Sequence, residues 1–297
     1  VGTQNAITNG ANNDVSGQNN AVANSHNNVV TGEFNDVVDG SNNNVVGGSN
    51  NYLDPSSGNM VVGDSNVLID SNNNGVVGTN NEAFNSNANL IGGDSAGLEN
   101  ANYNSVTGIG NAAVNAEANI IGGTSNGVSG GEGNNVSGYR NLLVNSDNNA
   151  VSGADNDLTD ANRNAISGEL NAVQGDDNVV GGAGNTVVGN TSLVVGDGAT
   201  SVGDNNLVTG QGAVATQGES IALGGDGDGD GVGAAALNDN TVAIGNDALA
   251  SGENASAVGF EAEASGDDAS AFGSGAAAQG DASTAVKISY AYTSTSG

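Results

Sequence analysis

The chain of 297 residues carries 33 acidic residues against three basic ones, a formal net charge of −30. Because Lys and Arg supply most of the affinity of proteins for phosphate, this balance argues against nucleic acid and anionic membranes as partners. The absence of cysteine excludes disulfides and thiolate metal sites. No apolar run approaches the ~18 residues of a membrane span, so we expect no membrane insertion. The chain starts with Val rather than Met, and we expect a processed product or a fragment.

The first two thirds of the chain repeat with a period of about fifteen residues. Residues 149–163 show the unit: two short apolar runs centred on Val151 and Leu158, each with an Asn two residues before its centre. Such a period is typical of stacked two-strand coils, so we predict an all-β parallel solenoid. The first-strand centres are Val15, Val30, Val45, Val61, Val76, Ile91, Val106, Ile121, Val136, Val151, Ile166 and Val180. Both strand series contain one longer step, and we expect its extra residue in the turn at residues 49–51.

An unbroken Asn series lies two residues before the first-strand centres, on the same, inward side of each strand. Stacked at one strand spacing of ~4.8 Å, these side chains are expected to form an amide ladder. Its predicted members are Asn13, Asn28, Asn43, Asn59, Asn74, Asn89, Asn104, Asn119, Asn134, Asn149, Asn164 and Asn178. A similar series precedes the second strands and is broken at Ala96.

After Val180 the period shortens to fourteen residues, and seven extra residues interrupt it near residue 230. We therefore divide the chain into an Asn-rich solenoid at residues 1–182, a second solenoid at residues 183–286 with a loop insertion at 225–240, and a C-terminal strand or tail at residues 287–297. In the tail, Val286, Ile288, Tyr290 and Tyr292 alternate on one face. This pattern predicts a strand that leaves the solenoid and either caps the last coil or pairs with another subunit.

One outward face of the second solenoid carries a continuous stripe of large apolar residues, too large to leave in water. We expect this stripe to be an oligomer interface, with a covering segment of the same protein as the alternative. The predicted interface residues are Leu193, Val195, Leu207, Ile221, Leu223, Val242, Ile244, Val258 and Phe272. In the Asn-rich half the outward faces mix apolar and polar pairs, and the pattern does not decide whether they pack or are solvated.

The same stretch carries short motifs of the form Thr-Val-Ala-Ile-Gly, Ala-Ser-Ala-Val-Gly and Ala-Ser-Ala-Phe-Gly at residues 241–245, 255–259 and 269–273. These motifs resemble the head repeats of trimeric autotransporter adhesins, with the best match over residues 200–286. The resemblance implies a left-handed parallel β-roll, three chains packed by the apolar strand, and display on a bacterial surface for adhesion. The Asn-rich coils are only loosely similar, and the sequence shows no coiled-coil stalk or membrane anchor.

A Gly-Asp run at residues 224–231 places Asp226, Asp228 and Asp230 at alternate positions, as in the first half of a calcium-binding loop. Leu237 stands where such a loop has a bidentate Glu. A calcium site is therefore one interpretation, and a solvated loop without a metal is the other. We expect no further cofactor.

Two stretches, residues 93–97 and 123–127, fit the Gly-x-Ser-x-Gly pattern of serine hydrolases. Both fall on the repeat lattice of a chain rich in Gly and Ser. A serine nucleophile needs a base, and the only histidine, His26, lies several coils away. We therefore expect no enzymatic activity.

These patterns predict an extracellular, non-enzymatic adhesive rod on a bacterial cell surface, built as a homotrimer that binds a host or matrix ligand through repeated lateral surfaces. A self-assembling filament subunit that stacks end to end is the main alternative. An ice-binding solenoid is a third hypothesis, although its flat face of repeated Thr is not evident here.

Overall fold

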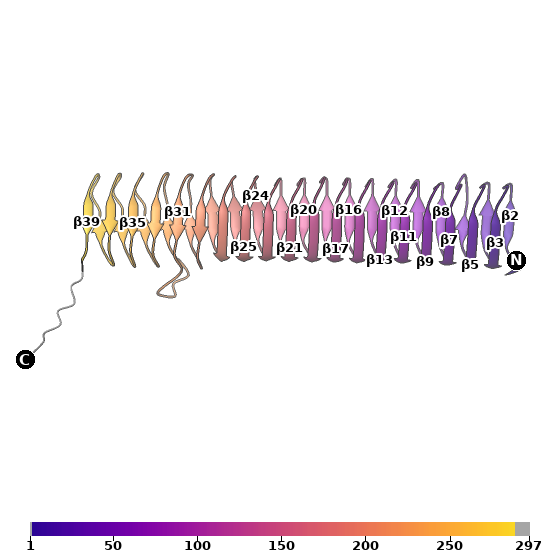
Figure 1. Ribbon diagram of the computed structural model, residues 1–297, viewed down its shortest axis with the longest axis horizontal. Coiled ribbons are helices and arrows are strands. Elements are labelled where there is room, and N and C mark those ends of the chain that lie inside the picture. Colours follow the sequence, from indigo (N-terminus) through magenta and orange to yellow (C-terminus); the bar gives the residue numbers. More distant parts are fainter. Residues whose placement is uncertain (1, 289–297) are drawn as a thin grey trace, which may run out of the picture. The chain divides into compact units, whose positions relative to one another are not determined.

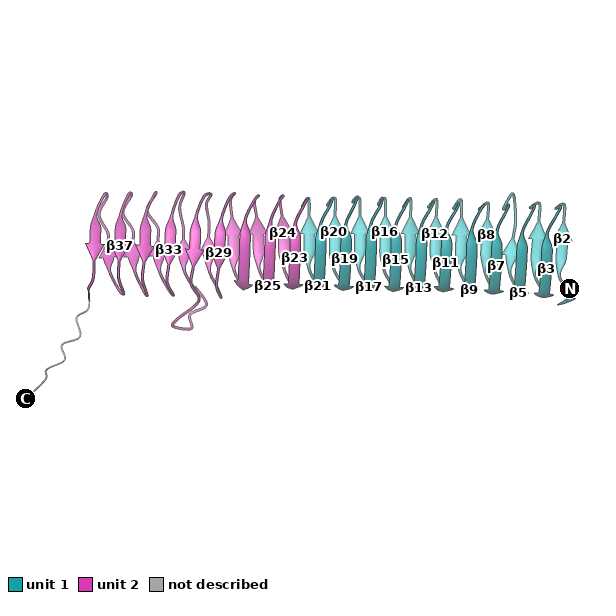
Figure 2. Cartoon of the chain, viewed as in Figure 1, with its two compact units in different colours: residues 1–162 teal, residues 163–297 magenta. Residues whose placement is uncertain are grey.

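The computed structural model describes residues 2–288. The chain divides into two compact units, Val1–Asn162 (unit 1) and Arg163–Gly297 (unit 2) (Figure 2). Within each unit a coil consists of two short strands, and strands of successive coils pair in parallel (Figure 1). Odd-numbered strands form one sheet, the odd-strand sheet, and even-numbered strands form the other, the even-strand sheet. Residues 2–288 contain no helix, and the predicted all-β parallel solenoid is confirmed.

In unit 1 the odd-strand sheet consists of β1 (Gly2–Thr3), β3 (Asp14–Gln18), β5 (Val29–Glu33), β7 (Val45–Ser49), β9 (Met60–Asp64), β11 (Gly75–Thr79), β13 (Leu90–Asp94), β15 (Ser105–Ile109), β17 (Ile120–Thr124), β19 (Asn135–Tyr139) and β21 (Ala150–Ala154). Its even-strand sheet consists of β2 (Ala6–Thr8), β4 (Ala21–Ala23), β6 (Asp36–Val37), β8 (Tyr52–Asp54), β10 (Val67–Ile69), β12 (Glu82–Phe84), β14 (Gly97–Glu99), β16 (Ala112–Val114), β18 (Gly127–Ser129), β20 (Leu142–Val144) and β22 (Asp157–Thr159).

In unit 2 the odd-strand sheet consists of β23 (Ala165–Glu169), β25 (Val179–Ala183), β27 (Leu193–Asp197), β29 (Leu207–Thr209), β31 (Ile221–Leu223), β33 (Val242–Ile244), β35 (Ser256–Val258), β37 (Ser270–Phe272) and β39 (Thr284–Val286). Its even-strand sheet consists of β24 (Ala172–Gln174), β26 (Thr186–Val188), β28 (Thr200–Val202), β30 (Val214–Ala215), β32 (Ala235–Ala236), β34 (Leu249–Ala250), β36 (Glu263–Ala264) and β38 (Ala277–Ala278).

The core of each unit is two facing columns, to which most strands contribute one buried residue. In unit 1 the columns are built mainly from Val, Leu and Ile, with alanine at Ala83 and Ala113; Leu68 and Ile91, for example, have no exposed surface. In unit 2 they change to alanine, as at Ala243 and Ala257. The branched side chains suit the pleated, buried surface of a strand. Because alanine is shorter, the two layers at these coils have less side-chain volume between them.

The odd-strand column of unit 1 departs from the prediction at one coil. Val30 pairs with Val46 rather than Val45; Val46 is fully buried, and Val45 is 49% exposed. Accordingly the ladder residue is Asn44, and the assignment of Asn43 was wrong. Val-Val and Asn-Asn doublets in this coil allow either register to satisfy the pattern. The extra residue lies not at residues 49–51 but at Gly40, where the φ of 94° suits glycine.

The predicted Asn ladder is present in unit 1 as a chain of buried amides. At Asn119, Nδ2 donates to Oδ1 of Asn104 at 3.0 Å and to the carbonyl of Gly131 at 2.9 Å, while Oδ1 accepts the backbone N–H of Asn134 at 2.8 Å. In unit 2 the ladder continues past Asn178 with hydroxyl side chains: the N–H of Ser192 donates to Asn178 Oδ1 at 2.9 Å. Buried side chains thus join successive coils, in addition to the strands, as far as Thr241; the next two coils carry Ala255 and Ala269 at this position.

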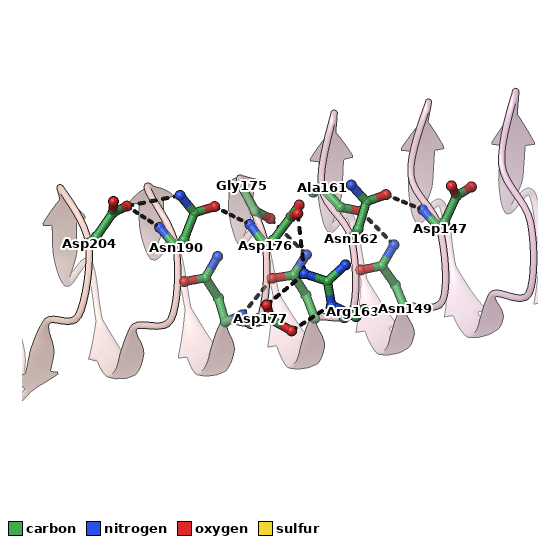
Figure 3. Close-up of polar contacts among 12 residues, drawn as sticks. Asp147, Asn149, Ala161, Asn162, Arg163, Gly175, Asp176, Asp177, Asn190 and Asp204 are labelled. Carbon is green, nitrogen blue, oxygen red and sulfur yellow. Dashed lines mark hydrogen bonds and ion pairs between the residues drawn. The ribbon is translucent and has the colours of Figure 1, made fainter.

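A third buried ladder, of serine, lies beside the two Asn series and was not predicted. The N–H of Ser56 donates to Ser41 Oγ at 2.9 Å, and the N–H of Ser71 donates to Ser56 Oγ at 3.0 Å. Alanine or glycine takes this position in several other coils, such as Ala101, so the sequence alone shows no continuous series. The shorter turn after β24 lacks the position, and Asn164 Nδ2 there donates to the carbonyl of Gly175 at 3.0 Å (Figure 3).

The two compact units meet between Asn162 and Arg163, and the division at the change of period, after residue 182, stays a proposal. The inserted loop is shorter than predicted. Ala215 pairs with Ala236, and Ala222 pairs with Ala243, so the extra residues lie within residues 224–234 and β32 occupies part of the range assigned to the loop. In the tail, Val286 ends β39, which pairs with β37 inside the sheet. Ile288 is 65% exposed and belongs to no strand; Tyr290 and Tyr292 lie outside the described residues.

Removal of one ladder amide is expected to destabilise unit 1. Asn119→Ala leaves the buried N–H of Asn134 without its acceptor, and an unsatisfied buried group costs about 1–3 kcal/mol. We expect the free energy of unfolding in denaturant to fall by about 2 kcal/mol. The control is Asn100→Gly: Asn100 lies in an exposed row of turn amides, glycine tolerates its φ of 50°, and the change should stay within about 0.5 kcal/mol. Equal effects of the two substitutions would contradict the role of the buried ladder.

The Asn series that precedes the second strands is interrupted at Ala96, and this gap allows the reverse experiment. Ala96 is buried, and its N–H donates to Asn81 Oδ1 at 3.0 Å, as the ladder residues of neighbouring coils do. We expect Ala96→Asn to restore the missing amide, accept the N–H of Asn111 and raise the midpoint of denaturation. A lower midpoint would show that the coil lacks room for the amide.

Candidate functional site

The nine residues predicted to form an interface lie in two neighbouring columns on the outside of the odd-strand sheet of unit 2. Strand register aligns Leu193, Leu207, Ile221 and Val242 in one column. In the other column, register aligns Val195, Thr209, Leu223, Ile244, Val258 and Phe272. Leu193 is 41% exposed, and Val195 and Phe272 are each 43% exposed. The columns together form one apolar surface, which we call the odd-strand face of unit 2.

The equivalent two columns of unit 1 form the odd-strand face of that unit. Large apolar side chains are also exposed here: Leu90 by 56% and Ile120 by 57% of their surface. The other exposed large apolar residues of these columns are Val29, Val45, Met60, Val62 and Val77. Gly, Ser and Thr occupy most of the remaining positions, for example Gly92 and Thr107.

Charge is nearly absent from both odd-strand faces, although the chain carries 33 acidic residues. In unit 1 the two columns hold a single charged residue, Asp14, and in unit 2 they hold none. The columns of the even-strand sheet differ. In unit 1 these carry Asp36, Asp54, Glu82, Glu99 and Asp157, and in unit 2 they carry Glu263.

Acidic residues border the odd-strand face of unit 1. Glu33, Asp64 and Asp94 stand at the ends of β5, β9 and β13, one position beyond the stacked glycines. Asp94 accepts hydrogen bonds from Thr79 Oγ1 at 3.0 Å and Ser95 Oγ at 3.1 Å, and these bonds hold the pKa of its carboxyl below the ordinary value. An apolar surface with a polar border is typical of a protein interaction site.

In unit 2 one turn edge concentrates carboxylates, a feature that the sequence analysis missed. Asp204 Oδ1 accepts the N–H of Asn190 at 2.7 Å (Figure 3), and Asp239 Oδ1 accepts the N–H of Gly218 at 3.1 Å. Together with Glu219 and Glu253, these acids line an open groove of 510 Å³. Two coils before Asp204, Asp177 pairs with Arg163 of the preceding coil at 2.7 Å. Only the stacking of turns brings these side chains together, because they are separated by a coil or more in sequence.

The inserted loop holds the predicted metal-binding residues, but their grouping differs from the prediction. Ligand atoms of Asp226, Asp228 and Asp247 lie within 4.8 Å of one another. Asp230 is not part of this group: its Oδ1 accepts the N–H of Val232 at 2.8 Å. Asp247 follows β33 in the next coil and was not predicted, because its position depends on how the loop folds back.

Two features of this carboxylate group favour a cation. Asp247 Oδ1 accepts the N–H of Gly227 at 2.9 Å, whereas Oδ2 is buried and has no hydrogen-bond partner. Asp226 accepts the N–H groups of Gly229 at 2.5 Å and Gly231 at 2.9 Å, which hold the pKa of its carboxyl below the ordinary value. Its charge therefore persists beside the desolvated oxygen of Asp247. Carboxylate and carbonyl oxygens are the ligands that Ca²⁺ prefers.

The residues considered for hydrolase chemistry occupy structural positions. His26 Nδ1 accepts the N–H of Ala11 at 2.9 Å, one coil away. Ser95 Oγ donates to its neighbour Asp94 at 3.1 Å. Both contacts are part of the turns that stack along unit 1.

Comparison with known families gave two matches. Residues 236–262 and 264–286 each match the YadA head domain repeat, so the resemblance to an adhesin head is confirmed for these coils. Residues 121–217 match the grass antifreeze beta roll family. No curated protein matched the chain. Among residues 2–288, no helix has the length and apolar character to cross a membrane.

We propose that the loop binds one Ca²⁺ through Asp226, Asp228 and Asp247, and we expect calorimetric titration with CaCl₂ to detect it with a Kd of about 10⁻⁴–10⁻³ M, typical of extracellular modules. Asp247→Asn should weaken binding by about tenfold or more, because it removes charge from the buried oxygen. The matched control, Asp230→Asn, should leave the affinity within about twofold. Absence of binding heat for the unaltered chain, or equal losses in both variants, would rule out this site.

Proposed function

We propose that the chain is a non-enzymatic adhesin head, displayed outside a bacterial cell, that assembles with copies of itself through its odd-strand faces. The observation that carries this proposal is the near absence of charge on these faces in a chain of net charge −30. The two head repeats in unit 2 support the same function. By the same resemblance the assembly is a homotrimer of left-handed β-rolls.

Electrostatics explains why assembly should use this face. Copies of a strongly acidic chain repel one another, and the repulsion is greatest where carboxylates would face each other without cations. The odd-strand faces allow close approach without such pairs. Burial of exposed Leu, Ile, Val and Phe then supplies the favourable free energy, at roughly 25 cal/mol per Å² of apolar surface.

Assembly by the odd-strand faces would leave the even-strand sheets and the turn edges for an external ligand. These surfaces repeat at each coil, so a ligand with a repeating structure could contact several coils at once and gain from multivalency. We propose a host or matrix surface as this ligand. Attraction between the acidic edges and a charged ligand would weaken as salt is added, because salt screens exposed charges that are separated by more than the Debye length of about 10 Å.

The assembly is tested by one pair of substitutions in neighbouring strands of unit 2. Ile244→Asp places a charge on the odd-strand face, and Leu249→Asp places one on the even-strand sheet; both native residues are half-buried. In sedimentation we expect trimers for the unaltered chain and for Leu249→Asp, and monomers for Ile244→Asp. Circular dichroism checks that each variant keeps its β-structure. Continuous fibres would favour the filament alternative, and monomers of the unaltered chain would refute both assembly hypotheses.

The adhesive function needs a separate assay. Beads coated with the chain should attach to surfaces coated with collagen, fibronectin or laminin more strongly than beads coated with albumin, because many weak contacts add through multivalency. Beads with the monomeric Ile244→Asp chain should detach at lower shear. Attachment no better than that of albumin beads to any of these proteins would contradict a matrix ligand and leave the assembly result unaffected.

Ice binding is the second candidate, favoured by the match of residues 121–217 to the grass antifreeze beta roll. Within this range the odd-strand face of unit 1 carries short side chains: Ser137 aligns with Ser152, and Asn135 aligns with Ala150. The adhesin hypothesis predicts that ice crystals grow unfaceted in the presence of the chain. Thermal hysteresis that is lost in Ser137→Tyr, with the fold retained, would assign this face to ice instead.

A further inference from the structure

The chain contains three Asn-Gly dipeptides: Asn9-Gly10, Asn74-Gly75 and Asn126-Gly127. In such a dipeptide the glycine backbone nitrogen can attack Cγ of the asparagine side chain, because no Cβ hinders its approach. A C–N bond forms, the side-chain amide leaves as ammonia, and the product is a cyclic succinimide. Water then opens the ring to give aspartate or isoaspartate. The sequence around each dipeptide provides the same reacting atoms, so any difference between them must come from structure.

Two of the three asparagines belong to the buried ladders. Asn74 is 2% exposed; its Nδ2 donates to the carbonyl of Ser86 at 2.9 Å, and its Oδ1 accepts the N–H of Asn89 at 2.9 Å. The N–H of Gly75, the attacking group, donates to the carbonyl of Asn89 at 2.9 Å. Attack at Asn74 therefore requires the coil to open, with loss of side-chain and strand hydrogen bonds together.

Asn126 belongs to the Asn series that precedes the second strands, and hydrogen bonds to the neighbouring coils fix its side chain in the same way. It is 1% exposed, its Nδ2 donates to the carbonyl of Gly122 at 2.8 Å, and its Oδ1 accepts the N–H of Asn141 at 2.9 Å. The N–H of Gly127 donates to the carbonyl of Asn141 at 2.9 Å. Both the electrophilic carbon and the attacking nitrogen are thus fixed and kept from water.

Asn9 lies instead in an exposed turn. Its side chain makes one recorded contact, from Nδ2 to Asn24 Oδ1 at 3.2 Å, and within residues 2–288 the N–H of Gly10 donates no hydrogen bond. The exposure belongs to the turn position, because Asn24 and Asp39 at the same place in the next two coils are also in contact with solvent. Cγ of Asn9 and the backbone nitrogen of Gly10 can therefore react without first breaking the hydrogen bonds of a buried ladder.

We infer that Asn9 is a site of spontaneous deamidation and that the ladders protect Asn74 and Asn126 from the same reaction. The product has a local consequence. A carboxylate at Asn9 cannot donate to Asn24 Oδ1, so the exposed row of amides that runs from Asn9 through Asn24 to Asp39 is broken at this coil. The chain also gains one negative charge there.

The test follows all three sites in one molecule. Two samples of the full chain are incubated in mildly alkaline buffer, one folded and one unfolded in concentrated urea. Samples are taken over time and digested, and deamidation of each Asn-Gly peptide is measured by mass spectrometry. In the folded chain we expect Asn9 to react roughly a hundredfold faster than Asn74 or Asn126, because reaction at the buried sites must wait for local opening. In urea the three rates should converge.

Each outcome decides between structure and sequence as the cause. Reaction of Asn74 or Asn126 in the folded chain at the rate of Asn9 would overturn the inference, because the ladder would then give no protection. The inference would also be overturned if Asn9 reacts in the urea-unfolded chain but stays intact in the folded chain. Detection of Asn9 peptides that have lost ammonia but have not yet added water would identify the succinimide as the intermediate.

Discussion

The structure depends on the hydrogen bonds that pass from coil to coil through buried asparagine side chains. A coil of two short strands has no core of its own, and its columns of Val, Leu or Ala become a core only when coils stack. The amide at each corner fixes the stacking, since Nδ2 and Oδ1 of one Asn contact the coils on both sides. Burial makes these bonds specific, because a slipped register would leave amides without partners. In unit 1 both the spacing and the alignment of coils therefore depend chiefly on asparagine, and in unit 2 Ser192, Ser220 and Thr241 share the role.

A fixed interior leaves the outward positions free to differ, and the two sheets use that freedom differently. Outward columns of the even-strand sheet in unit 1 include five acids, whereas the two columns of the odd-strand face include only Asp14. Carboxylates elsewhere gather at turn edges, such as Asp204 and Asp239 in unit 2. A surface without charge in so acidic a chain is the physical basis for the proposed assembly, and the even-strand sheets and edges are the surfaces proposed for ligand contact.

The sequence predicted the interior well because the same residue types recur at each coil. The error at Val45 and Asn43 arose where doublets satisfied two registers equally, and only the pairing of Val30 with Val46 separates them. The serine ladder was missed because Ala and Gly interrupt it. Asp247 was missed for another reason: it joins Asp226 and Asp228 through the path of the inserted loop, which no local pattern describes. Periodic contacts are therefore legible in the sequence, and contacts made by irregular segments are not.

The most direct test of the central claim is the solvent access of the odd-strand face in solution. The chain has no cysteine, so single thiols can report on either sheet. Thr209 lies between Val195 and Leu223 in a column of the odd-strand face, and Thr200 lies in β28 of the even-strand sheet. In the isolated chain Thr209 is the more exposed of the two. Our account predicts that the thiol of Thr209→Cys is protected from alkylation in the assembled protein and that the thiol of Thr200→Cys reacts readily. Faster reaction at Thr209→Cys would contradict assembly through this face.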